Sequence, residues 1–288
     1  KVLHACSEDL ELVRHHFGAS PRGLFDTQLA NAFLCPHYSV SFTRLVSERL
    51  DIELQQHETR SNWRARPLTE KQIRYAWEDV YYLPPLHAML HEALVETGRL
   101  AWFREEMDLR GRFELGDPET YYLSVKKAWR LPGAARSRLQ TLCAWRETEA
   151  MADDRPRSRV VKDEHLLTMA QLEVISEQDV RGVLPPNVAR RYAPALLAAH
   201  AEGRQRHHPP PAEQPLTRSQ SELVSKLRDV GRSRAETLGI APELLSRKRE
   251  VEACVRQFAQ RGELSEAYLG WRNEVVGDEF RMLLEAGS

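Results

Sequence analysis

The stretch from Thr69 to Leu83 constrains the fold most strongly, because it predicts where one helix begins and where it ends. Thr69-Glu-Lys-Gln72 is a capping box, in which each of the two end side chains satisfies a backbone N–H at the start of a helix. Pro84-Pro85 predict an interruption, since proline has no N–H to donate and its ring crowds the preceding turn. An apolar helical period resumes at Leu86. The sequence therefore predicts a capped helix after Thr69, an interruption at the prolines and a second helix from Leu86.

Tyr75 and Asp79 lie four positions apart within the first of these predicted helices. Residues with this spacing share one helical face, so the phenol and the carboxylate can point into a single site. Such a pair would place a metal ligand beside a group that handles a proton. A plainer alternative is a solvent-facing carboxylate next to a core tyrosine, and the surrounding segments favour the first interpretation.

Three further segments accompany this pair. The chain begins Lys1-Val-Leu-His-Ala-Cys-Ser-Glu-Asp9-Leu10, a strand-like start followed by a helix with Ser7 as the predicted cap and Gly18 as the predicted stop. Phe25-Asp26-Thr27-Gln28 opens a further helix, and Trp63-Arg-Ala-Arg-Pro67-Leu68 precedes the capping box.

Taken in order, the four segments resemble the ribonuclease D family, which comprises 3′→5′ exoribonucleases of the DEDD superfamily in the subgroup marked by a tyrosine. The interval of 70 residues between Asp9 and Asp79 fits the third and fourth acidic positions of that family. The resemblance implies a ribonuclease-H-like α/β exonuclease domain that uses Mg²⁺ or Mn²⁺, with Asp9 and Asp79 as metal ligands and Tyr75 positioning the attacking water. Carboxylates suit such hard ions, and a pair of ions stabilises the charge that builds on the attacking and leaving oxygens.

One departure from the family concerns the other two acidic positions. In the family they lie in an Asp-x-Glu strand upstream of the segment that contains His4-Ala5, called the HA segment below. This chain begins at that segment, with Lys1. We therefore expect it to lack the first strands of its catalytic domain, and we expect this polypeptide to bind metal poorly and to cut RNA slowly or not at all. A smaller departure lies in the loop at 54–62, where a lysine and an acidic residue common in the family are replaced. Substrate contacts assigned to that loop are accordingly in doubt.

The middle of the chain resembles an HRDC domain, a small helical module that often assists nucleic-acid binding. Residues 126–162 contain ten Lys and Arg against four Asp and Glu, although the whole chain has a formal charge of −1. Phosphates attract such a surface without regard to base sequence. The alternative is an ordinary solvated helix face with an arginine-rich loop. The residues predicted to contact nucleic acid are Lys126, Lys127, Arg130, Arg155, Arg157 and Arg159.

Three domains are predicted: a partial exonuclease domain at 1–110, an HRDC domain at 117–205 that opens with an Asp117 cap before Pro118, and a second, divergent HRDC-like helical domain at 206–288. The proline-rich segment 202–215 is expected to be an extended spacer. No run of about 20 apolar residues predicts a membrane helix. The four cysteines form no C-x-x-C pair, which argues against structural zinc and favours a reducing cytoplasm.

The predicted activity is the release of nucleoside 5′-monophosphates from RNA 3′ ends, with transfer RNA precursors as the substrate class that the family implies. The sequence has no phosphate-binding glycine loop, so no nucleotide cofactor is expected, and a monomer is favoured. Two other interpretations remain open. One is a non-catalytic RNA-binding protein with a decayed nuclease fold, and the other is a DNA-acting nuclease or helicase accessory region.

Overall fold

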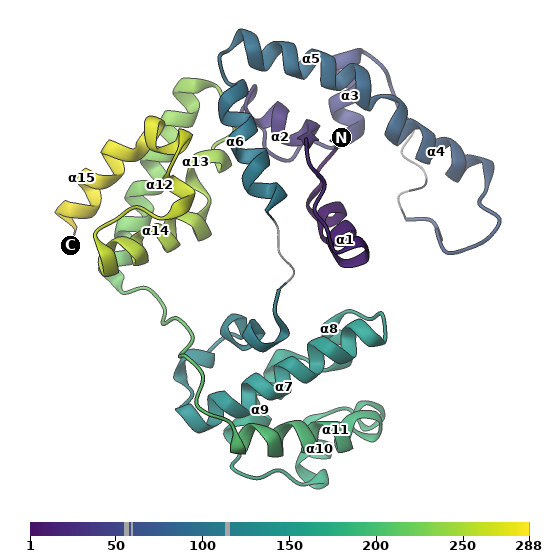
Figure 1. Ribbon diagram of the computed structural model, residues 1–288, viewed down its shortest axis with the longest axis vertical. Coiled ribbons are helices and arrows are strands. Elements are labelled where there is room, and N and C mark those ends of the chain that lie inside the picture. Colours follow the sequence, from purple (N-terminus) through teal and green to yellow (C-terminus); the bar gives the residue numbers. More distant parts are fainter. Residues whose placement is uncertain (55–57, 59, 113–115, 288) are drawn as a thin grey trace. The chain divides into compact units, whose positions relative to one another are not determined.

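The computed structural model describes residues 1–54, 58, 60–112 and 116–287 (Figure 1). The chain divides into two compact units. The first unit combines Lys1–Glu114 with Leu216–Ser288, and the second unit is Leu115–Pro215. Helices dominate both units, as the sequence predicts.

The N-terminal part of the first unit carries a short sheet and six helices. Strands β1 (Val2–Leu3) and β2 (Phe25–Asp26) pair in parallel, with Val2 opposite Phe25, and they form the sheet of the described residues. The helices are α1 (Ser7–Phe17), α2 (Thr27–Ala32), α3 (Phe42–Leu50), α4 (Glu70–Tyr81), α5 (Leu83–Glu96) and α6 (Leu100–Gly111).

Most of the predicted helix ends are confirmed. Thr69 and Gln72 form the capping box that starts α4. Helix α4 ends at Tyr81 and α5 begins at Leu83, three residues earlier than predicted, so the proline pair lies in the first turn of α5, where a missing N–H costs little. Gly18 ends α1 in the left-handed conformation, with φ of 63°. The prediction of Ser7 as the cap of α1 is wrong by one position. Cys6 is the cap residue, and it contributes no side-chain hydrogen bond to the helix in the described structure.

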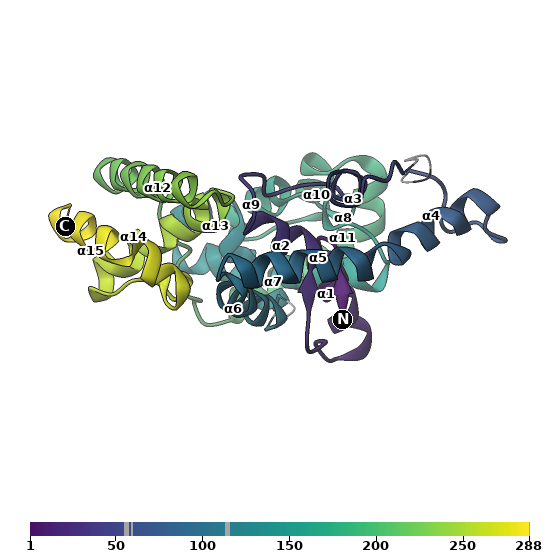
Figure 2. The same ribbon diagram turned by 90° about the horizontal axis from the view of Figure 1, so that it is seen from above.

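The C-terminal part of the first unit consists of helices α12 (Arg218–Leu238), α13 (Glu243–Ser246), α14 (Lys248–Arg261) and α15 (Asp278–Ala286), with a 3₁₀ turn at Glu266–Tyr268 and a π-helical turn at Asn273–Gly277. Both views place α15 and α4 at opposite ends of this unit (Figures 1 and 2).

The two parts of the first unit share one hydrophobic core. Phe33 packs against Trp271 with ring centroids 5.2 Å apart, and Trp102 stacks on Trp271 at 5.3 Å. Backbone groups also join them, since the Ala241 N–H donates to the Ala32 carbonyl at 2.8 Å. The helical domain predicted at 206–288 thus belongs, from Leu216 onward, to the same unit as the exonuclease segments.

The second unit is entirely helical in the residues described. It comprises 3₁₀ turns at Pro118–Ser124 and Ala128–Arg130, and helices α7 (Gly133–Ala152), α8 (Arg157–Val160), α9 (Asp163–Gln171), α10 (Glu177–Val183) and α11 (Pro186–Gln205). Asp117 caps the first turn and Pro118 occupies its first position, as predicted. Helix α11 continues through Gln205, so the spacer predicted from residue 202 begins later than expected.

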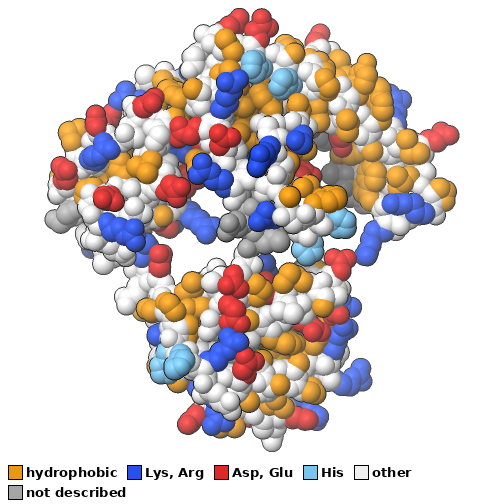
Figure 3. Space-filling model, viewed as in Figure 1, with side chains coloured by type: hydrophobic (Ala, Val, Ile, Leu, Met, Phe, Trp, Pro, Cys, Tyr) orange, Lys and Arg blue, Asp and Glu red, His pale blue; other side chains and the backbone are white. Residues whose placement is uncertain are grey.

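The surface of the first unit carries exposed apolar side chains. Figure 3 shows hydrophobic side chains gathered over α4 and α5, where the exposed large hydrophobic residues are Ile73, Trp77, Val80, Tyr81, Met89 and Val95. None of the described helices is both long enough and apolar enough to cross a membrane.

Candidate active site

Helix α4 carries two of the three predicted catalytic residues. Tyr75 and Asp79 are both partly buried on one face of the helix, and the Tyr75 ring lies 5.8 Å from the ring of Trp63. Partial burial, together with the nearby charge of Glu78, raises the pKa of the Asp79 carboxyl above its ordinary value. A nearby positive charge would stabilise the ionised form of a carboxylate in this environment, and a bound metal ion would supply such a charge.

Gln72 holds the segment before α4 against the helix. Its side-chain nitrogen donates to the Ser61 hydroxyl at 3.0 Å and to the Asn62 carbonyl at 3.3 Å, while its oxygen accepts from the Thr69 N–H. The Trp63 segment is therefore tied to the helix that carries Tyr75. The sequence predicts Gln72 only as a capping residue. The capping box pattern does not indicate the contacts that Gln72 makes with Ser61 and Asn62.

Asp9 lies in the first turn of α1, where it is exposed. Its helix starts at a turn that the buried carboxylate of Asp26 holds through the Ala5 and Cys6 N–H groups, at 3.0 and 3.1 Å. Asp26 also caps α2. The FDTQ segment predicts the start of a helix, but nothing in its sequence indicates that Asp26 reaches back to the segment of Asp9.

The described residues place Tyr75 and Asp79 together but leave Asp9 on a separate element. In both views α4 extends outward past the end of α5, away from α1 (Figures 1 and 2). Within 1–54, 58, 60–112 and 116–287, no group of three or more His, Cys, Asp or Glu is arranged to hold a metal ion. Asp9 and Asp79 have the oxygen donors that Mg²⁺ and Mn²⁺ prefer, yet by themselves they are only part of a ligand set. Part of the loop at 54–62 lies outside the described residues.

The six residues predicted to bind nucleic acid fall into two groups in the second unit. Lys126, Lys127 and Arg130 precede α7, whereas the three arginines at 155, 157 and 159 follow it. Helix α7, with 20 residues, lies between the two groups in the sequence.

Arg130 lies over the Trp129 ring, 4.9 Å from its centroid, and Arg157 also has partners within the protein. The Arg157 guanidinium lies 4.5 Å from the Tyr121 ring centroid and 3.3 Å from Glu147. All six residues are exposed.

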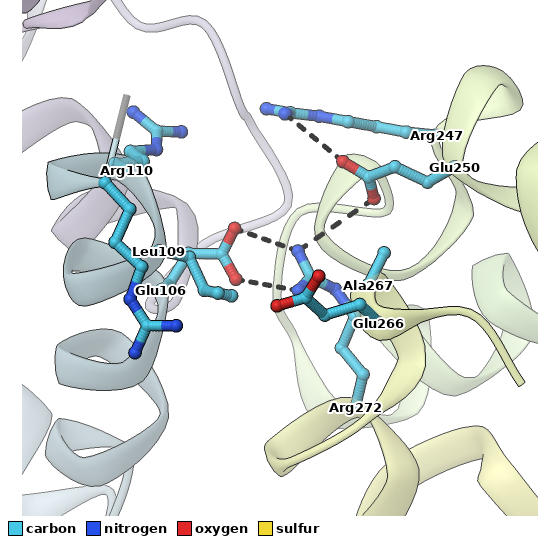
Figure 4. A pocket seen from close by; sticks show the side chains of 9 residues that line it. Glu106, Leu109, Arg110, Arg247, Glu250, Glu266, Ala267 and Arg272 are labelled. Carbon is cyan, nitrogen blue, oxygen red and sulfur yellow. Dashed lines mark hydrogen bonds and ion pairs between the residues drawn. The ribbon is translucent and has the colours of Figure 1, made fainter. Parts of the chain in front are cut away.

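A cavity of about 450 Å³ lies within the first unit, between α6 on one side and α14 with the 3₁₀ turn at Glu266–Tyr268 on the other (Figure 4). Four of its charged groups form ion pairs with one another. Arg272 contacts Glu106 at 2.8 Å, and Arg247 lies 3.6 Å from Glu250.

Comparison with known proteins assigns these features to a class. The family model described as 3′-5′ exonuclease matches residues 1–95, and the HRDC domain model matches residues 135–199. The fold and the site residues thus define a 3′-5′ exonuclease that carries an HRDC domain.

The relatives give the particular family. Ribonuclease D of Pseudomonas paraeruginosa is 39% identical over 295 residues, covering 99% of this chain and 78% of the relative, and ribonuclease D of Desulfotalea psychrophila is 30% identical with 98% and 78% covered. The crystal structure of Escherichia coli RNase D, described as an exoribonuclease involved in structured RNA processing, matches with a TM-score of 0.86 at 30% identity over 99% of this chain and 79% of that chain. The chain belongs to the ribonuclease D family of 3′-5′ exoribonucleases. Exonucleases of this type generally depend on divalent metal ions.

Proposed function

We propose that the protein removes nucleoside 5′-monophosphates one at a time from RNA 3′ ends, with transfer RNA precursors as its substrates. The observation that carries this proposal is the pairing of Tyr75 with Asp79 on one face of α4, where Asp79 has a raised pKa. Membership of the ribonuclease D family, and the structured-RNA role stated for the E. coli relative, support an RNA substrate.

Each residue of the site then has a defined task. Asp9 and Asp79 would supply carboxylate oxygens to the divalent ions, which when bound stabilise the negative charge that develops on the phosphate oxygens. The Tyr75 hydroxyl would orient the attacking water toward the scissile phosphate.

Substitutions on α4 test this assignment in the protein expressed from its complete reading frame. We expect Asp79→Asn and Tyr75→Phe each to lower kcat on labelled single-stranded RNA by roughly 100-fold or more, by analogy with loss of other positioned catalytic groups. RNA affinity should be nearly unchanged. Matched controls are Glu70→Gln and Tyr81→Phe, which lie on the same helix with exposed side chains and should keep wild-type rates. Wild-type rates in Asp79→Asn would remove this residue from the site.

The choice between RNA and DNA needs a separate measurement. Equal degradation of single-stranded RNA and DNA of one sequence would favour a general nuclease over the proposed ribonuclease. Faster trimming of a transfer RNA precursor than of an unstructured RNA with the same 3′ end would support the proposed substrate class.

We infer further that the second unit contributes RNA contacts through Lys126, Lys127, Arg130, Arg155, Arg157 and Arg159. Replacing the first three with Ala, or separately Arg155 and Arg159, should weaken RNA binding and flatten its dependence on salt, because each phosphate contact releases counterions. Arg181, which pairs with Glu177 at 2.9 Å, offers a control arginine in the same unit. An unchanged salt slope in both sets would contradict the inference.

A further inference from the structure

Asp26 lies where the HA segment and the FDTQ segment meet, and its side chain is fully buried. Its Oδ1 accepts from the N–H groups of Gln28 at 2.9 Å and Leu29 at 3.2 Å, which is ordinary capping of α2. The same oxygen also accepts from the Ala5 N–H at 3.0 Å. The second oxygen, Oδ2, accepts from the Cys6 N–H at 3.1 Å.

We propose that Asp26 is a positioning residue for Asp9. By holding the backbone of the turn from which α1 starts, it fixes the direction in which the first turn of that helix presents the Asp9 carboxylate. This inference rests on the proposed role of Asp9 as a metal ligand.

The turn before α1 needs such support for two reasons. Ala5 adopts φ of 55°, in the left-handed region that residues with a Cβ disfavour. The cap position, Cys6, gives α1 no side-chain hydrogen bond in the described structure. Asp26 therefore stabilises a strained turn that has no cap of its own. Asp9 is three residues beyond Cys6, so a shift of the helix start moves its carboxylate directly.

The position of Asp26 is itself fixed from the other side. Arg110 of α6 donates from Nη1 to Oδ2 at 3.1 Å, and it also donates to the Tyr38 hydroxyl. Arg247 of α14 donates to the same hydroxyl and stacks over the Tyr38 ring at 4.5 Å. Figure 4 shows Arg110 and Arg247 on facing sides of the cavity. A continuous set of contacts thus joins α14, through Tyr38 and Arg110, to Asp26 and the start of α1.

This geometry is more than a helix cap requires. A cap uses one oxygen on its own helix, whereas Oδ2 makes both of its contacts with groups outside α2. Asp26→Asn separates the two tasks. The amide oxygen can still cap α2, but the amide nitrogen is a donor, and it would face the Cys6 N–H and the Arg110 guanidinium.

The test measures Mn²⁺ binding to the RNA-free protein expressed from its complete reading frame, by the spin-resonance signal of free Mn²⁺, and kinetics on single-stranded RNA. We expect Asp26→Asn to weaken Mn²⁺ binding about tenfold, the scale seen when outer-shell support of a metal ligand is lost. The kcat should fall at least as much while KM for RNA changes by less than about twofold, and added Mn²⁺ should restore part of the rate.

The Asp26→Asn variant is compared with a milder variant and with a control for stability. Tyr38→Phe removes only the hydroxyl that joins Arg110 to Arg247, and it should weaken Mn²⁺ binding measurably but less than Asp26→Asn does, because it acts on Asp26 only through Arg110. Leu45→Ala empties a buried position of α3 in the same unit without touching Asp26. It should lower the melting temperature and leave Mn²⁺ affinity unchanged.

Asp9→Asn separates this inference from the proposed function. If Asp9→Asn loses Mn²⁺ binding while Asp26→Asn and Tyr38→Phe retain it, the positioning role is wrong and the role of Asp9 stands. If Asp9→Asn binds Mn²⁺ like the wild type, the proposed ligand itself is wrong. If Leu45→Ala loses as much Mn²⁺ affinity as Asp26→Asn does, the effect of Asp26→Asn comes from a general loss of stability, and the inference is overturned. If Asp26→Asn does not fold, the Tyr38→Phe result decides.

Discussion

Arg146 is a buried cation whose charge is matched inside the second unit. Its side chain is 1% exposed, contacts Glu147 at 3.0 Å and Asp163 at 2.5 Å, and donates to the Val161 carbonyl. Replacing one partner of such a cluster leaves a buried charge without compensation. We expect Arg146→Leu to lower the free energy of unfolding by about 3–5 kcal/mol.

The matched control is Arg181→Leu in the same unit. Arg181 is largely exposed and pairs with Glu177 within α10, so its loss should cost less than about 0.5 kcal/mol. Urea unfolding of the two variants measures both values. A similar small loss in Arg146→Leu would contradict the structural role of the cluster.

Two histidines, the partly buried His4 and the buried His200, make stability depend on pH. Burial is the largest cause that lowers the pKa of His4 and of His200 below 6.5, and each ring is hydrogen-bonded, His200 to the Leu172 carbonyl at 3.0 Å. The unfolded chain takes up these protons first as pH falls, so the stability they contribute is present above pH 6.5 and is lost on acidification through the lowered folded-state values. The urea concentration at the midpoint of unfolding should therefore decrease as the pH is lowered from 7.5 to 5.

Substitution of His200 tests this dependence on pH. His200→Gln should flatten the fall in urea midpoint, whereas His207→Gln, at an exposed site, should leave its slope unchanged. An identical slope in wild type and His200→Gln would exclude His200 as a contributor.

At the scale of single elements, two glycines have opposite roles. Gly203 lies where α11 packs closely on α7, whereas Gly182 lies in α10. A Cβ on Gly203 would lie 2.6 Å from the Arg138 Cα and 2.9 Å from the Ser137 carbonyl oxygen, both backbone atoms. A Cβ on Gly182, in α10, would meet open space. We expect Gly182→Ala to stabilise the protein by roughly 0.5–1 kcal/mol through helix propensity. Gly203→Ala should destabilise it by about 1–3 kcal/mol, because the two helices must separate. Chemical unfolding of both variants checks the signs, and stabilisation by Gly203→Ala would refute the close approach.

Elements whose ends are encoded locally could be predicted from the sequence. The capping box at Thr69, the stop at Gly18 and the turn at Pro118 each depend on a few adjacent residues. The cap of α1 could not be predicted, because its support comes from Asp26, about 20 positions away along the chain. The burial of individual arginines could not be predicted from the sequence either. The basic count in 126–162 includes Arg138 and Arg146, which the structure buries, since a sequence shows charge but not which arginines are enclosed.

At the scale of the whole molecule, the boundary predicted between exonuclease and C-terminal helical domains does not coincide with a boundary in the core. Arg99 donates to the Phe33 carbonyl at 2.6 Å and also to the Leu238 carbonyl. Trp271 donates from its ring nitrogen to Glu106 at 3.2 Å. These contacts lie inside a single hydrophobic cluster, whereas the second unit has its own. Resemblance locates modules along the chain, but shared burial decides which of them unfold together.

We therefore expect two unfolding transitions in calorimetry, one for each unit. Leu45 of α3 and Leu227 of α12 are fully buried in the first unit, and Leu142 of α7 is fully buried in the second. Each change to Ala should cost about 2–5 kcal/mol. Leu45→Ala and Leu227→Ala should lower the same transition, and Leu142→Ala should lower the other.

Hydrogen exchange assigns the transitions independently. In Leu227→Ala, protection should fall across residues 25–50 as well as across 216–288, because opening the shared core exposes both parts. Loss of protection confined to 216–288 in that variant, or a third calorimetric transition, would show that the C-terminal helices unfold alone. The contacts of Arg99 and Trp271 would then be too weak to couple them to the exonuclease segments.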